Sequence, residues 1–139
     1  DMAYWSFTEN IISGAPIRVF NNGDLKRDFT YIDDIVSGVI ATATQPMKPD
    51  RPVPHRIYNI GNNQPVALMR FIEIIEQAVG REAVKKFEPM QAGDVYATYA
   101  DIDAISADYG FAPTTPLEAG IPKFVEWYKE YRKSAGGAA

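Results

Sequence analysis

The stretch from Arg27 to Gly38, R-D-F-T-Y-I-D-D-I-V-S-G, is the most informative part of this sequence. It opens with a cation, a carboxylate and aromatic rings, and it continues into a run with apolar residues at positions 32, 35, 36, 39, 40 and 43. These three- and four-residue intervals predict an amphipathic helix over residues 32–44. The sequence therefore predicts a strand-to-helix junction with charged groups at the join.

Arg27 has two interpretations. Its planar guanidinium matches phosphate oxygens and makes it a candidate for holding a diphosphate. A surface ion pair with the neighbouring Asp28 is the simpler outcome. Asp33 and Asp34 open the predicted helix, where carboxylates complement the helix dipole, and we expect them to cap it.

Before this stretch, the pattern predicts a helix over residues 2–13 that stops at Gly14, a short strand over 17–20 and a turn over 21–24. Residues 26–31 are expected to be extended, so that the two strands form a hairpin-like excursion. The chain begins at Asp1 with no signal-peptide pattern, and we expect this start to lie inside a larger protein.

After the helix, four prolines predict a surface loop over residues 46–54. The sequence then predicts a strand over 56–61, a helix over 66–79, a strand over 83–89, a loop over 91–94, an extended piece over 95–100, and helices over 101–109 and 117–132. This is a mixed α/β order whose strands look insufficient for a complete doubly wound sheet. We expect one domain over residues 1–133 and a flexible tail over 134–139.

Composition narrows the function classes. The 139 residues include 14 Lys and Arg against 18 Asp and Glu, for a net charge of -4, and the basic residues are diffuse, so we expect no nucleic-acid binding. There is no cysteine and one histidine, His55, which we expect to be solvated rather than catalytic. No apolar run is long enough for a membrane span, and the scattered carboxylates make a metal site improbable.

No G-x-G-x-x-G motif and no P-loop occurs, so nothing here cradles a dinucleotide in the usual way. Gln91 and Asp94 lie on a predicted loop, where Asp94 is either an acceptor for sugar or ribose hydroxyls or a residue that stabilises the turn. The aromatic residues of the last helix are expected to be core rather than a ligand platform. They are Phe124, Trp127, Tyr128 and Tyr131.

Taken together, several strings resemble one family. They are P-I-R-V-F-N-N-G-D, the stretch quoted above, Y-N-I-G-N-N-Q-P-V, M-Q-A-G-D-V-Y-A-T-Y-A-D and G-F-A-P-T-T-P-L-E-A-G-I-P-K-F-V-E-W-Y. In this order they resemble the C-terminal part of NAD-dependent epimerase/dehydratase proteins, which are extended short-chain dehydrogenase/reductases, and within them the UDP-glucuronate 4-epimerase branch. The resemblance runs from Asp1 to about Arg132.

The resemblance implies a substrate site. Arg18 and Phe20 would line a uridine pocket, partly through backbone groups, and Arg27 would contact the diphosphate with Phe29 beside it. Asp94 would contact the ribose. Many relatives have an arginine where this sequence has Gln91, so this site would have one positive charge fewer beside the diphosphate.

The resemblance also implies a reaction, in which bound NAD oxidises C4 of a UDP-sugar and the resulting 4-keto sugar is reduced on its other face. The family's catalytic Tyr belongs to a Y-x-x-x-K motif, and this sequence contains neither that motif nor the glycine motif for NAD. We therefore expect no catalytic and no cofactor-binding residue here, and an inactive chain when isolated. An N-terminal NAD-binding domain would complete the fold, and without it we expect exposed apolar surface or self-association.

Alternatives stay open. The parent could be another UDP- or dTDP-sugar decarboxylase, dehydratase or epimerase, or the chain could be a non-catalytic sugar-nucleotide-binding or dimerisation module. The resemblance favours a cytoplasmic enzyme that serves capsular polysaccharide synthesis.

Overall fold

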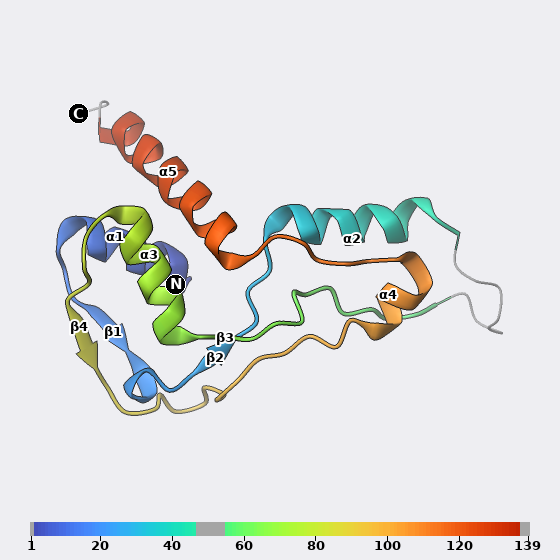
Figure 1. Cartoon of the computed structure of the whole chain (residues 1–139), viewed down its shortest axis with the longest axis horizontal. Coiled ribbons are helices and arrows are strands. Elements are labelled where there is room, and N and C mark those ends of the chain that lie inside the picture. Colours follow the sequence, from blue (N-terminus) through green and yellow to red (C-terminus); the bar gives the residue numbers. More distant parts are fainter. Residues whose placement is uncertain (1, 47–54, 137–139) are drawn as a thin grey trace. The chain divides into compact units, whose positions relative to one another are not determined.

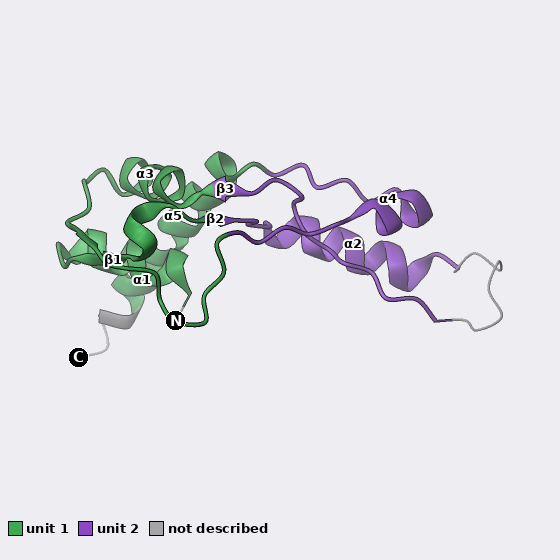
Figure 2. Ribbon diagram, turned by 90° about the horizontal axis from the view of Figure 1, so that it is seen from below, with its two compact units in different colours: residues 1–25, 67–96, 116–139 green, residues 26–66, 97–115 purple. Residues whose placement is uncertain are grey.

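The structure is a computed structural model that describes residues 2–46 and 55–136. Its residues group into two compact units, each assembled from separate parts of the chain (Figure 2). Unit 1 comprises residues 1–25, 67–96 and 116–139, and unit 2 comprises residues 26–66 and 97–115. Segments distant in the sequence assemble each unit, and the single domain expected over residues 1–133 stays a prediction.

Unit 1 is a small α/β assembly (Figure 1). Its elements are α1 (Ala3–Ser13), β1 (Ile17–Val19), the single turn η1 (Phe20–Gly23), α3 (Leu68–Val79), β4 (Lys85–Phe87) and α5 (Leu117–Gly136). Helix α3 packs against both α1 and α5. The fully buried side chains come from all three helices and from β1, and they include Ile11, Ile17, Phe71, Ile75 and Val125. This shared core follows from the apolar stripes that the sequence predicted.

The strands of unit 1 pair in a way that the sequence did not predict. Strand β1 runs parallel to β4, with Ile17 opposite Lys85 and Val19 opposite Phe87. The predicted hairpin is therefore wrong. A parallel pair needs a long crossover rather than a tight turn, and the intervening chain contains α3. Residues 20–23 do form a turn, as predicted, but the strand that follows it is not the partner of β1.

Helix ends follow the predicted signals with small shifts. Gly14 and Gly80 both adopt left-handed backbone at helix C-termini, as their positions predicted. Helix α3 begins at Leu68 rather than residue 66, because the preceding two residues form strand β3 (Val66–Ala67). Helix α5 continues to Gly136, so the first part of the predicted flexible tail is helical.

The aromatic residues of α5 are only partly core. Tyr128 is fully buried, and Trp5 of α1 packs edge-on against it with ring centroids 5.0 Å apart. Trp127 and Tyr131 are 49% and 44% exposed and stack on one another. The prediction that all four aromatic residues are buried is wrong for these two, because the apolar stripe is wider than the face that the neighbouring helices cover.

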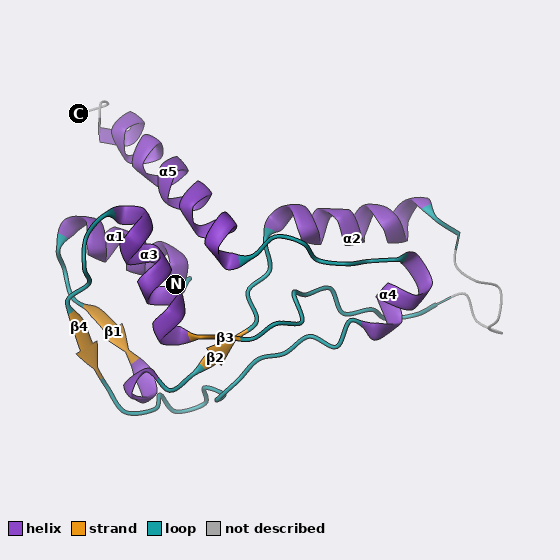
Figure 3. Cartoon of the chain, in the orientation of Figure 1, coloured by secondary structure: helices purple, strands orange, loops and turns teal. Residues whose placement is uncertain are grey.

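Unit 2 has less regular structure (Figure 3). It holds α2 (Ile32–Thr44), strand β2 (Lys26–Arg27) paired with β3, and α4 (Asp103–Tyr109). Its buried cluster consists of Ile102, Ile105 and Phe111, with Tyr58 and Ile60 packed against it. Irregular segments therefore supply much of this core.

Two predicted strands are reduced or absent. Residues 56–61 form no strand in the part of the chain that the structure describes, and residues 95–100 keep one parallel bridge, between Lys26 and Ala97. A strand requires a neighbour for its ladder, and the described residues supply none to 56–61. The side chains of residues 56–61 instead contact other parts of unit 2, where Arg56 and Tyr58 both donate to the Asp108 carboxylate. Burial and that hydrogen bond raise the pKa of Tyr58 to about 12.

Helix α2 has the bounds that the sequence predicted, but its acidic residues act differently. Its N-cap is Tyr31, and no side chain caps it. Asp34 is buried, and its two carboxylate oxygens accept the backbone N–H groups of Thr114 at 3.1 Å and Thr115 at 3.0 Å. The capping prediction is therefore wrong for Asp33 and Asp34, and the Asp34 carboxylate instead anchors another segment of unit 2.

Much of the apolar surface of α2 is unburied, as we expected. Gly38 faces Ile60 and Phe111. The exposed apolar residues, between 44% and 60% exposed, are Ile32, Val36, Val39 and Ile40. His55 is also exposed, as expected of a solvated residue. The predicted loop over residues 46–54 lies outside the described residues apart from Pro46.

Candidate functional site

The first two predicted site residues are Arg18 in strand β1 and Phe20 at the start of the turn η1. The Arg18 guanidinium lies 4.7 Å from the centroid of the Phe20 ring, and its Nε and Nη2 atoms donate to the Glu88 carboxylate at 3.0 and 2.6 Å. The hydrogen bond with Arg18 lowers the pKa of Glu88. The Arg18 side chain is therefore paired with a carboxylate of the same unit. No sequence signal pointed to Glu88.

The turn after Phe20 is left-handed over three consecutive residues. Asn21, Asn22 and Gly23 have φ angles of 48°, 51° and 85°. The conformation is held because Asn21 Nδ2 donates to the Asp24 carbonyl at 2.7 Å and the Asn22 N–H donates to the Glu88 carbonyl at 3.1 Å. Asn tolerates this region better than most residues, but such backbone still costs free energy and clusters at functional sites. The turn is thus a candidate for direct backbone contact with a ligand.

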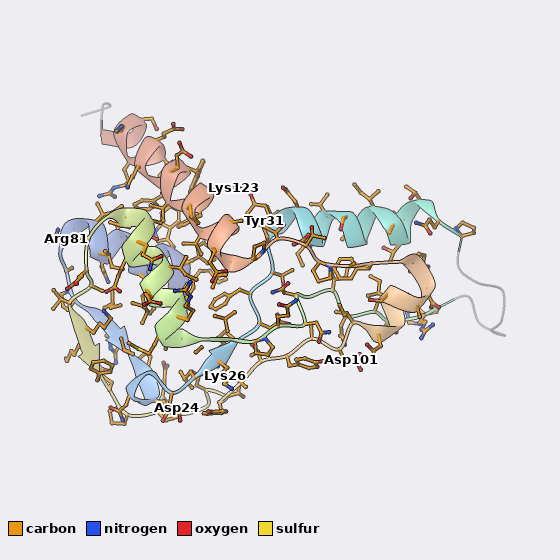
Figure 4. All side chains as sticks on the ribbon, viewed as in Figure 1. Asp24, Lys26, Tyr31, Arg81, Asp101 and Lys123 are labelled. Carbon is orange, nitrogen blue, oxygen red and sulfur yellow. The ribbon has the colours of Figure 1, made fainter. Side chains whose placement is uncertain are left out.

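The loop that carries Gln91 and Asp94 is tied to that turn. The Asp94 N–H donates to the Gln91 carbonyl at 3.2 Å, and the Val95 N–H donates to Asp94 Oδ1 at 2.8 Å. Just beyond, the Tyr96 hydroxyl donates to Asp24 Oδ1 at 2.9 Å, and Asp24 stands at the end of the left-handed turn (Figure 4). The Asp94 carboxylate therefore does stabilise its own loop, while unit 1 gathers Arg18, Phe20, Gln91 and Asp94 on connected segments.

Unit 2 carries the other two predicted residues, Arg27 and Phe29, on either side of Asp28. Arg27 Nη1 donates to the Lys26 carbonyl at 2.8 Å. The Asp28 carboxylate accepts the N–H groups of Ala100 at 3.0 Å and Asn63 at 3.1 Å, so its oxygens serve backbone groups from two loops. The sequence had suggested Asp28 only as an ion-pair partner for Arg27. Its position inside the resemblance string was the one signal of a larger role.

Two cavities lie away from these residues. In unit 1, about 440 Å³ is lined by residues of α1 and α5, among them Lys129 and Arg132. Lys129 donates to the carbonyls of Ala78 and Val79 at the end of α3, and Arg132 pairs with Glu9, so these cations already serve helix ends and a carboxylate. The cavity of about 390 Å³ in unit 2 is lined by His55, Arg56 and Tyr58 with their neighbours. Neither lining contains a predicted site residue, so we base the candidate site on the polar residues above.

Among the described residues, no group of His, Asp or Glu side chains is arranged to hold a metal ion. Within the same residues, no helix is both long and apolar enough to cross a membrane.

The family model and the curated proteins that match this chain point to similar proteins. The model of the NAD dependent epimerase/dehydratase family matches residues 3–61. Protein CapI of Staphylococcus aureus is 42% identical over 145 residues, which cover 96% of this chain and 43% of that protein. A probable UDP-glucuronate 4-epimerase of Rhizobium meliloti is 40% identical over 148 residues, and UDP-glucuronate 4-epimerase 1 of Arabidopsis thaliana is 42% identical over 142 residues. This chain covers 43% and 33% of those two proteins, respectively.

Solved structures agree on the fold. The UDP-glucuronic acid 4-epimerase from Bacillus cereus, in complex with NAD, superposes with a TM-score of 0.79 at 28% identity, over 95% of this chain and 39% of that one. MoeE5 in complex with UDP-glucuronic acid and NAD has a TM-score of 0.83 at 24% identity, which supports the fold alone. This chain thus spans about two fifths of the solved proteins that it resembles.

Proposed function

Because this chain is related to the NAD-dependent epimerase/dehydratase family, we propose that it is the sugar-nucleotide-binding, C-terminal part of a nucleotide-sugar epimerase. The parent reaction is the interconversion of UDP-glucuronate and UDP-galacturonate. The observation that carries this proposal is 40% identity to a probable UDP-glucuronate 4-epimerase over 96% of the chain.

The site geometry fits a binding role. A nucleoside diphosphate needs a surface for the base, acceptors for the ribose and a cation for the phosphates. Within unit 1, Phe20, the left-handed turn after it and the Asp94 loop are the candidates for the base and the ribose. Within unit 2, Arg27 is the candidate for the phosphates. Arg27 is the phosphate ligand in this proposal, because a guanidinium binds two phosphate oxygens at once.

NAD does not fit the residues of this chain. The sequence contains no glycine-rich dinucleotide fingerprint and no Tyr followed four residues later by Lys. NAD, where bound, supplies the hydride chemistry, and we assign its binding and the catalytic base to an N-terminal domain outside this chain. This chain's own residues bind and orient the nucleotide, and the isolated chain is inactive.

The exposed face of α2 supports a further domain in the parent protein. A stripe of four large exposed apolar residues on one helix is unusual on the solvent-facing surface of a complete protein. We assign this face to contact with the N-terminal domain. In the isolated chain, pairing between copies is the competing way to cover it.

Two finer points belong to the same proposal. The similarity to Protein CapI supports a role in supplying nucleotide sugar for a capsular polysaccharide. We place the parent enzyme in the cytoplasm.

The test uses the full-length protein loaded with NAD. We expect UDP-glucuronate to be converted to UDP-galacturonate, whereas UDP-glucose and dTDP-glucose are poor substrates. Calorimetric titration should show binding of UDP and UDP-glucuronate but not dTDP. Arg27→Ala should weaken UDP at least tenfold, while Arg70→Ala, which removes a cation paired with Glu73 and Glu118 on the surface of unit 1, leaves the affinity unchanged. Turnover of UDP-glucose in place of the uronate would refute the substrate assignment.

A further inference from the structure

We propose that Asp28 is a positioning residue for nucleotide binding, which fixes Arg27 and Phe29 by tying their segment to two loops of unit 2. The inference rests on the proposed function, since it concerns the same nucleotide site, but it adds a residue that contacts no ligand. Its basis is the set of backbone groups that one carboxylate collects.

The Asp28 carboxylate is the meeting point of three chain segments. Its Oδ2 accepts the N–H groups of Ala100 at 3.0 Å and Asn63 at 3.1 Å, and its Oδ1 accepts the Gln64 N–H at 3.4 Å. The Asp28 N–H donates to Thr98 Oγ1 at 2.9 Å. Hydrogen bonds to an ionised acceptor are stronger than neutral ones. The Asp28 carboxylate therefore links its own segment to both loops through backbone N–H groups.

Close packing reinforces this set of hydrogen bonds to the Asp28 carboxylate, which we call the anchor. A Cβ atom added at Gly61 would lie 2.3 Å from the Ala100 Cβ and 3.3 Å from Asp28 Oδ2. Only glycine lets the two loops approach closely enough for both to reach the same carboxylate. Asn63 also adopts a left-handed backbone, with φ of 60°, at the point where its N–H turns toward Asp28.

The anchor bears directly on the proposed ligand residues. Lys26 and Ala97 form a parallel bridge, and the Thr98 N–H donates to the Lys26 carbonyl at 3.3 Å, so residues 26–28 run extended beside 97–98. Successive side chains of an extended chain alternate between faces. Strand β2 covers Lys26 and Arg27, and with Asp28 held against the loops we expect its two neighbours along the chain, Arg27 and Phe29, on the opposite face. Losing the anchor releases both of them together.

Asp34 provides a matched control. It is also a carboxylate of unit 2 that accepts backbone N–H groups, those of Thr114 and Thr115, but it does not flank a proposed ligand residue. Asp28→Asn and Asp34→Asn remove the same charge and should lower the melting temperature by similar amounts. Only Asp28→Asn is expected to disturb Arg27.

The experiment measures UDP affinity by calorimetry in the full-length, NAD-loaded protein, well below each variant's melting temperature. We expect Asp28→Asn to weaken UDP about tenfold, Asp34→Asn to leave it within twofold, and Asp28→Asn to add little once Arg27→Ala is present. NAD affinity should not change in any variant. If wild-type protein binds UDP but the Asp28→Asn and Arg27→Ala effects multiply, or Asp34→Asn weakens UDP equally, the positioning role is refuted. If wild-type protein does not bind UDP, the proposed function itself fails and this inference fails with it.

Discussion

Replacing Gly61 with alanine tests the packing of unit 2 at its tightest point. The added methyl would lie 2.3 Å from the Ala100 Cβ, whereas ordinary carbon contacts are about 3.5–4.0 Å. The two loops would have to separate by more than an ångström, and the separation pulls the Ala100 N–H away from Asp28 Oδ2. Overpacking of this kind costs about 1–3 kcal/mol, and a weakened hydrogen bond to a charged acceptor adds about 1 kcal/mol. We therefore expect Gly61→Ala to lower the free energy of unfolding by about 2–4 kcal/mol.

The matched control is Gly38→Ala in α2. There the new methyl would lie 3.2 Å from side-chain carbons of Ile60 and Phe111, which can shift by a few tenths of an ångström. Alanine also favours a helix interior over glycine by about 1 kcal/mol, which offsets the crowding. Urea denaturation of the full-length protein, with hydrogen exchange to localise the change, would compare the two. Equal effects of the two substitutions, or a Gly61→Ala cost below about 0.5 kcal/mol, would refute the close-approach argument.

Three further predictions concern single groups. Burial alone would raise the pKa of Asp34, but hydrogen bonds from Thr114 and Thr115 outweigh it and hold this pKa below its ordinary value of 3.8. The ionised carboxylate therefore stabilises the fold above that pH, and this stabilisation is lost as the pH falls through the folded-state pKa. Asp34→Asn should lower the free energy of unfolding by about 1–3 kcal/mol at neutral pH and flatten the acid-unfolding curve in that range, and an unchanged curve would contradict this. The hydrogen bond to Asp24 raises the pKa of Tyr96, so this contact holds at neutral pH and is lost above the folded-state pKa. Because the contact ties down the loop before Tyr96, Tyr96→Phe should speed amide exchange over residues 91–95, whereas the control Tyr99→Phe should leave it unchanged. Ile40→Lys on the exposed face of α2 should reduce self-association and dye binding by the isolated chain, measured by ultracentrifugation and fluorescence, and no reduction would remove that face from the interface.

Local elements were predictable because their signals are local. Helix α2 has the bounds that its apolar spacing predicted, and Gly14 ends α1 as its position predicted. These features depend on side-chain periodicity and on the freedom of glycine to adopt positive φ, which neighbours along the chain decide. The resemblance strings likewise indicated, from the sequence itself, the similarity to epimerase/dehydratase proteins that the comparisons found.

The pairing of strands was not predictable in this way. The turn after Phe20 resembles a hairpin turn in composition, yet β1 pairs with β4 rather than β2. A parallel partner arrives through a crossover that no local pattern encodes. The strand expected at residues 56–61 is missing for a related reason, because strand propensity is realised only where a neighbouring strand is available.

The sequence by itself determined which segments are helical, the glycines that end α1 and α3, the absence of a dinucleotide motif and the resemblance to the epimerase/dehydratase proteins, because each is carried by residue type and spacing. Only the tertiary structure decided what the polar side chains do. Asp28 and Asp34 look alike in the sequence, as acidic residues near a helix start, but Asp28 accepts N–H groups from two loops and Asp34 accepts those of Thr114 and Thr115. A carboxylate's role depends on which distant N–H groups reach it, and that is fixed only when the segments are packed together.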